Sequence, residues 1–147
     1  MSLRAIVLAA GRGTRMKSER PKVLFPVAGR PLVSWALDAV AGAGADEIVV
    51  VVGHGADQVR AVLPDGVRAV VQEPQLGTGH AVMTALAEMG EVAGDTILVV
   101  PGDTPLLQPG TLQALVAALS GAPATIAPTV TRPRRRRLCR HGRTVRT

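Results

Sequence analysis

Residues 3–11 read Leu3-Arg4-Ala5-Ile6-Val7-Leu8-Ala9-Ala10-Gly11, a short apolar segment that runs directly into small residues and a glycine. Its first six residues are typical of a buried strand, because a near-continuous apolar run fits a strand that is covered on both faces. Strands of this kind belong to parallel sheets, in which helices pack on either side. The segment therefore predicts an α/β fold with a loop at the carboxyl end of this strand.

The rest of the chain repeats this pattern of apolar strands separated by amphipathic helices. Further strands are predicted at 47–52, 67–72 and 96–100, with a weaker candidate at Ala124–Ala127. Helical periodicity predicts helices between them. The alternation predicts a doubly wound, mainly parallel sheet of Rossmann-like type with helices on both faces, whose ligands bind at the carboxyl ends of the strands. The first predicted helix starts at Pro31, which suits the first helical position. Three more helices are predicted at Asp57–Leu63, His80–Met89 and Thr111–Leu119.

Composition excludes several classes of protein. The 147 residues suffice for one domain, and 47% hydrophobic against 19% charged residues excludes wholesale disorder. No apolar run approaches the roughly 20 residues that cross a bilayer, and the N-terminus does not resemble a signal peptide, so no membrane partner is expected. The one cysteine, Cys139, excludes an internal disulfide and suits a reducing cytoplasm.

Charge divides the chain into two parts. Residues 1–131 hold nine basic and all eleven acidic residues, a net charge of −2, whereas residues 132–147 hold eight arginines and no acid. We interpret the first part as the domain and the second as a disordered arginine-rich tail, or as the product of a frameshift in a GC-rich coding sequence. Sequencing the gene tests the frameshift. The tail could bind polyanions, but it lacks aromatic residues for stacking bases, so nucleic acid is not an expected partner.

The loop after the first strand is rich in small and basic residues. Glycines allow backbone N–H groups to approach a ligand closely, and five cations against one acid favour phosphate binding. A Walker A sequence is absent, and the dinucleotide-binding pattern lacks its third glycine. An ordinary solvated basic loop is the alternative. The cations are Arg12, Arg15, Lys17, Arg20 and Lys22, and the acid is Glu19.

Three motifs together resemble one enzyme family. The run Leu8-Ala9-Ala10-Gly11-x-Gly13-Thr14-Arg15-Met16, followed by Pro21-Lys22-Val23-Leu24, resembles the signature of nucleotidylyltransferases that make NDP-sugars. Two later motifs are similar to the uridyltransferase domain of the bifunctional N-acetylglucosamine-1-phosphate uridyltransferase/glucosamine-1-phosphate acetyltransferases. They are Gln75-Leu76-Gly77-Thr78-Gly79-His80-Ala81-Val82 and Gly102-Asp103-Thr104-Pro105-Leu106.

The resemblance implies a uridylyltransferase that forms UDP-N-acetylglucosamine and pyrophosphate from UTP and N-acetylglucosamine 1-phosphate. The product would supply peptidoglycan and lipopolysaccharide synthesis in the cytoplasm. Arg15 would hold the triphosphate, and Lys22 would reach the phosphate that is transferred. An isolated lysine is usually a surface residue, but the position of Lys22 after Pro21 within the motif favours the functional role. The backbone of the first loop would contact uracil and ribose. The implied loop residues are Leu8, Ala9, Ala10, Gly11 and Gly13.

Further implied site residues follow the third and fourth predicted strands. The carboxamide of Gln72 could pair with the edge of uracil, and Gly77 and Thr78 would contact the nucleotide, although Leu-Gly-Thr-Gly also suits a plain turn and cap. His80 is expected to pack or cap at a helix start. Asp103, with Pro101 and Gly102, would bind substrate and hold Mg²⁺, while an Asx-turn or N-cap is its structural alternative.

The resemblance covers residues 3 to about 127. The sequences of family members continue beyond the point where the resemblance ends. Family members go on to acceptor-sugar contacts, a second metal ligand and a trimerising, acetylating β-helix domain, none of which this sequence contains. Weak or absent turnover, and no homotrimer, are therefore expected. Two other functions stay open: a nucleotidylyltransferase for CTP or dTTP, and a non-catalytic fragment that binds nucleotides or polyanions.

Overall fold

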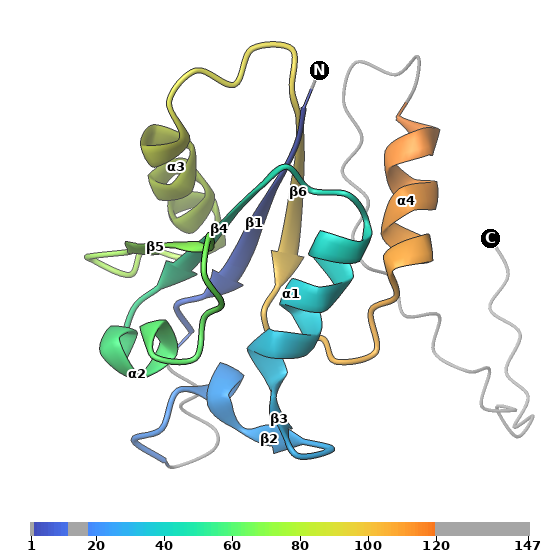
Figure 1. Cartoon of the computed structure of the whole chain (residues 1–147). Coiled ribbons are helices and arrows are strands. Elements are labelled where there is room, and N and C mark those ends of the chain that lie inside the picture. Colours follow the sequence, from blue (N-terminus) through green and yellow to red (C-terminus); the bar gives the residue numbers. More distant parts are fainter. Residues whose placement is uncertain (1, 12–17, 120–147) are drawn as a thin grey trace, which may run out of the picture.

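The protein is described by a computed structural model that covers residues 2–11 and 18–119. Four parallel strands form the central sheet in the order β5-β4-β1-β6 (Figure 1). The four principal predicted strands are confirmed, and the candidate at Ala124–Ala127 lies outside the described residues. The strands are β1 (Leu3–Ala9), β4 (Glu47–Val52), β5 (Arg68–Val71) and β6 (Thr96–Pro101).

Helices cover both faces of the sheet, which confirms the doubly wound prediction. Alternate residues of β1 point to opposite faces, so Val7 packs with α1 (Leu32–Gly42) and Leu112 of α4 (Pro109–Ala118). Ile6 instead packs on the other face with α3 (Thr78–Met89). The short helix α2 (Ala56–Arg60) joins the α1 side through Val59, which is fully buried. Figure 1 shows α3 on one side of the sheet and α1 and α4 on the other.

Helix boundaries differ from the predicted ones by a few residues. Pro31 is the residue before α1, with an extended ψ of 143°, and not the first helical residue as predicted. The helix α3 begins two residues before His80, because Gly77 has a φ of 100° and sets off the first turn. The helix α4 begins at Pro109, whose fixed φ suits the first helical position. The helix α2 ends at Arg60, and the predicted continuation to Leu63 consists of turns.

A 3₁₀ helix, η2 (Lys22–Leu24), and a hairpin of β2 (Pro26–Val27) with β3 (Arg30–Pro31) were not predicted. The two central hairpin residues, Ala28 and Gly29, have φ values of 49° and 78°, as in a type I′ turn. Trp35 on α1 donates a hydrogen bond to the carbonyl of Val27 at 3.1 Å. The hairpin is thereby fastened to α1 beyond the carboxyl ends of the strands (Figure 1).

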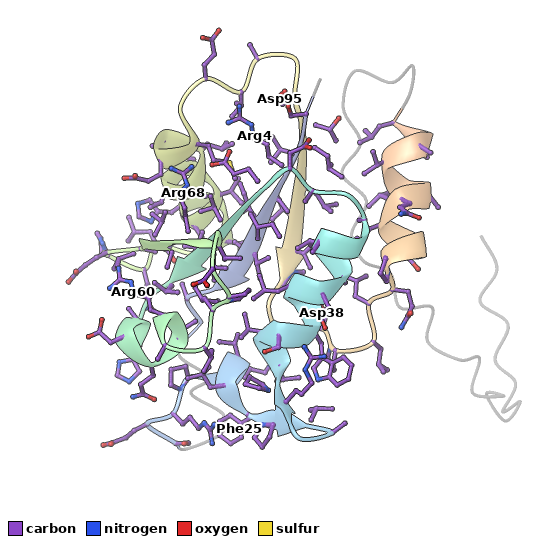
Figure 2. All side chains as sticks on the ribbon, in the orientation of Figure 1. Arg4, Phe25, Asp38, Arg60, Arg68 and Asp95 are labelled. Carbon is purple, nitrogen blue, oxygen red and sulfur yellow. The ribbon has the colours of Figure 1, made fainter. Side chains whose placement is uncertain are left out.

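An ion-pair network joins the strands at their amino ends. Arg4 contacts Asp95 at 2.8 Å and Glu47 at 3.2 Å, and it also donates to the carbonyl of Met89 at 3.1 Å. Arg68 pairs with the same Glu47. Figure 2 shows Arg4 and Asp95 at the amino end of the sheet and Phe25, which follows η2, beyond the carboxyl end. No helix among the described residues is long and apolar enough to cross a membrane.

Candidate functional site

The loops that carry the predicted site residues all leave the same edge of the sheet. In a parallel sheet every carboxyl end lies at one edge, so residues after β1, β4, β5 and β6 gather there. The segment η2 and the hairpin lie beyond this edge (Figure 1). Residues distant in sequence are thus brought to one side of the molecule, as the sequence predicts.

Lys22 and Asp103 are in direct contact, although 81 residues separate them. The Nζ of Lys22 donates to Oδ2 of Asp103 at 2.5 Å. Lys22 is held in place by its neighbours, because Pro21 is fully buried and Val23 and Leu24 belong to the core. Its own side chain stays 47% exposed, so the ammonium group can reach a ligand.

Asp103 reaches this position because the chain after β6 lies against β1. The N–H of Gly102 donates to the carbonyl of Leu8 at 2.9 Å. A Cβ on Gly102 would lie 3.0 Å from the Leu8 carbonyl oxygen and 3.3 Å from Val23, so glycine permits this close approach. Leu8 is paired in register with Pro101, the last residue of β6.

The carboxylate of Asp103 does not cap a helix. The nearest helix, α4, has Gln108 at its N-cap without a side-chain hydrogen bond. The turn after β6 is closed instead by Thr104, whose hydroxyl donates to the carbonyl of Pro101 at 2.8 Å. The Asx-turn and N-cap alternatives therefore do not describe Asp103, which faces Lys22.

Gln72 is the one buried polar or charged residue among the described residues, with 4% of its surface exposed. Its backbone N–H donates to the carbonyl of Val52 at 2.8 Å and extends the contact between β5 and β4 by one residue. Its side-chain Nε2 lies 2.9 Å from the carbonyl oxygen of Gly77 and 3.0 Å from Nδ1 of His80. Gln72 thus holds the exposed loop before α3 against the end of β5.

Gly53, which the sequence analysis did not single out, connects the two parts of the edge. A Cβ at Gly53 would lie 2.1 Å from Nε2 of Gln75 and 2.9 Å from the carbonyl oxygen of Ala10. The glycine lets the loop before α3 approach the end of β1. A glycine directly after the strand Glu47–Val52 is the signal that could have identified it.

The remaining predicted residues that the structure describes lie at the end of β1 and at the start of α3. Leu8 and Ala9 are the last residues of β1, Ala10 is buried, and Gly11 is exposed beside them. Gly77 and Thr78 are exposed at the start of α3. Gly13 and Arg15 lie outside the described residues.

The carboxylate of Asp103 suits a divalent cation that is shared with phosphates. Within residues 2–11 and 18–119 no cluster of three or more His, Cys, Asp or Glu side chains could hold a metal by itself. Mg²⁺ is usually bound by only one or two carboxylates, with water and substrate phosphates completing its shell. One carboxylate with 31% of its side chain exposed, next to an ammonium group, therefore fits a metal that arrives with a nucleotide.

A parallel sheet covered on both faces, with glycine-containing loops at the carboxyl ends of its strands, is an architecture that this chain shares with solved nucleotidyltransferases. A nucleotidyl transferase from Methanothermobacter has a TM-score of 0.69 and 31% identity, over 79% of this chain and 57% of that one. Rv0371c from Mycobacterium tuberculosis, in complex with manganese, has a TM-score of 0.66 and 31% identity, over 80% of this chain and 59% of that one. Over residues 5–145 the sequence matches the MobA-like NTP transferase domain, and the chain belongs to this family.

Curated relatives confirm the resemblance that the three motifs indicate. The chain is 52% identical over 126 residues to the bifunctional protein GlmU of Trichlorobacter lovleyi, a match that covers 83% of the chain. The same match covers 27% of that relative, so the chain spans about a quarter of the length of the curated relatives it matches.

Proposed function

We propose that this chain forms the nucleotide-binding part of a uridylyltransferase that makes UDP-N-acetylglucosamine and pyrophosphate from UTP and N-acetylglucosamine 1-phosphate. The observation that carries the proposal is the contact of Lys22 with Asp103, which joins two of the three motifs at 2.5 Å. An ammonium group and a carboxylate at that edge suit a triphosphate and its divalent cation. The sugar and the nucleotide are those that the motif resemblance implies, and the identity of 52–53% to the bifunctional GlmU proteins supports that resemblance.

The order of the strands suggests how UTP lies across the edge. Gln72 follows β5, whereas Asp103 follows β6, and these are the first and last strands of the described sheet. Three strand spacings of about 4.8 Å separate them by roughly 14 Å, which matches an extended nucleoside triphosphate. We place the base near Gln72, Gly77 and Thr78 and the phosphates near Lys22. The first loop, from Leu8 to Gly11, lies between these ends because β1 is next to β6.

The reaction requires alignment and charge neutralisation more than a covalent nucleophile. An oxygen of the sugar 1-phosphate attacks the α-phosphorus of UTP, the bond from that phosphorus to the bridging oxygen breaks, and pyrophosphate leaves. Lys22 would stabilise the charge on the phosphate that is transferred. Asp103 would hold Mg²⁺, which supplies Lewis-acid charge stabilisation when bound. Arg15 remains the predicted partner of the triphosphate.

Calorimetric titration of the full chain with UTP and with UDP-N-acetylglucosamine, with and without Mg²⁺, tests the proposal. We expect UTP binding that strengthens with Mg²⁺ in the wild type and loses this dependence in Asp103→Asn. Pyrophosphate release in the presence of N-acetylglucosamine 1-phosphate then measures turnover. Tighter binding of CTP or dTTP would favour a different nucleotidylyltransferase. Binding that disappears on deletion of residues 132–147 would favour a polyanion-binding fragment.

A further inference from the structure

The hydrogen bonds of the buried Gln72 amide fix which of its two ends faces the protein. The carbonyl oxygen of Gly77 only accepts hydrogen bonds, so the atom 2.9 Å away must be the amide nitrogen. The same nitrogen lies 3.0 Å from Nδ1 of His80. Both hydrogens of the amide are therefore used within the protein, and Nδ1 of His80 must accept one of them.

The other end of the amide is left for a ligand. Among the described residues, no donor forms a hydrogen bond with Oε1 of Gln72. Every buried side-chain nitrogen and oxygen atom of the described residues does have a hydrogen-bond partner. Oε1 therefore belongs to the small exposed part of the residue, at the carboxyl end of the sheet. An amide that could rotate freely would present either a donor or an acceptor there, whereas this one presents an acceptor only.

His80 is itself held in the first turn of α3. Its backbone carbonyl accepts a hydrogen bond from the hydroxyl of Thr84 at 2.8 Å, and the next residue, Ala81, is buried in the core. The ring is partly buried beside Gln72. Removing the ring would take away one of the two acceptors that define the orientation of the amide.

We infer that His80 is a positioning residue for base recognition: it fixes the Gln72 amide with nitrogen inward, so that Oε1 accepts from the N3–H group of bound uracil. This inference rests on the proposed function, which places the base near Gln72. Uracil presents an N–H donor at N3, whereas cytosine presents a lone pair at N3 that would face another acceptor. His80 would thereby contribute to a preference for UTP over CTP without touching the nucleotide.

The test compares UTP and CTP affinities of the full chain in three forms. We expect the wild type to prefer UTP, and His80→Leu to reduce that preference about tenfold by weakening UTP binding alone, as for one lost hydrogen bond. His80→Asn should restore the preference, because its Oδ1 can accept where Nδ1 did. An equal loss of UTP and CTP binding in His80→Leu would indicate a merely structural role and would overturn the inference.

The outcomes also separate this inference from the proposed function. A wild type with no UTP preference would contradict both, whereas a UTP preference that persists in His80→Leu would contradict only the role of His80. Nitrogen NMR of the wild type without nucleotide gives a second measurement, which holds even if His80→Leu does not fold. It should show His80 with Nε2 protonated and Nδ1 bare, and a proton on Nδ1 would overturn the inference.

Discussion

The amino and carboxyl edges of the sheet both carry cation–carboxylate pairs, but these pairs differ in how completely the cation is surrounded. At the amino edge Arg4 contacts Asp95, Glu47 and a backbone carbonyl, and only 20% of its side chain is exposed. At the carboxyl edge Lys22 has the single described partner Asp103 and is 47% exposed. The guanidinium of Arg4 stabilises the fold through its three partners. The ammonium group of Lys22 has one partner that a ligand could replace, so it is available for binding. The two ends of the sheet therefore differ in how completely their cations are paired within the described residues.

The largest effect is expected from breaking the amino edge. Arg4→Ala should lower the free energy of unfolding by about 2–3 kcal/mol, because it leaves the partly buried Asp95 and Glu47 without their shared partner. Chemical denaturation measures this loss. The variant should bind UTP with unchanged affinity at a temperature where it is folded, and weakened UTP binding there would contradict the separation of the two edges.

The next effect is expected at Gly53, where the carboxyl edge depends on a close backbone approach. Gly53→Ala should destabilise the fold by about 1–3 kcal/mol, because its Cβ would lie 2.9 Å from the Ala10 carbonyl oxygen. It should also weaken UTP binding, since the displaced loops hold the predicted nucleotide contacts. Gly110→Ala is the matched control, because a Cβ there meets no atom within 4 Å. Equal stabilities of the two variants would refute the role of Gly53.

Lys22 is expected to show the opposite pattern to Arg4: its removal should weaken UTP binding and leave stability nearly unchanged. Lys22→Ala should weaken UTP binding by about 10- to 100-fold, the range for a lost hydrogen bond to a charged group. The free energy of unfolding should change by less than about 1 kcal/mol, because the pair with Asp103 is partly exposed to solvent. Calorimetry and denaturation on the same preparation measure both. A loss of stability without a loss of UTP affinity would mean that Lys22, like Arg4, only stabilises the fold.

The smallest effect is expected at an exposed ion pair within a single helix, α2, which contains no predicted site residue. Arg60 contacts Asp57 at 3.2 Å on α2, and the Asp57 side chain is 98% exposed. Arg60→Ala should change the free energy of unfolding by less than about 0.5 kcal/mol and leave UTP affinity unchanged. It is the control for the loss of one positive charge in Lys22→Ala. A salt-dependent fall in UTP affinity would instead mean that net charge dominates binding.

The sheet was predictable from sequence because its strands are nearly pure aliphatic runs. Strand β4, with four consecutive fully buried valines, leaves no other location than the centre of a covered sheet. The hairpin could not be predicted in the same way, since both of its strands contain proline and its turn places Ala28 at positive φ. That conformation is stabilised by contacts with Trp35 on α1, which local sequence does not encode.

The site was predictable to the extent that its motifs follow strands. Lys22 and Asp103 were both expected at the carboxyl edge, and the structure joins them. The partnership of Gln72 with His80 was not predicted, because eight residues and an irregular loop separate them and no periodicity relates the two. Gly53 was passed over for a similar reason: its neighbours, Gln75 and Ala10, come from two other loops.

The attachment of the hairpin gives the chain a built-in optical reporter. Trp35 is its only tryptophan, and the sequence contains no tyrosine. The indole donates to Val27 and lies 4.7 Å beneath the guanidinium of Arg30, which also contacts Asp38 at 2.8 Å. Because the hairpin directly follows η2, fluorescence from this one ring reports on the segment that carries Lys22. Excitation at long ultraviolet wavelengths would follow that segment alone, without a label.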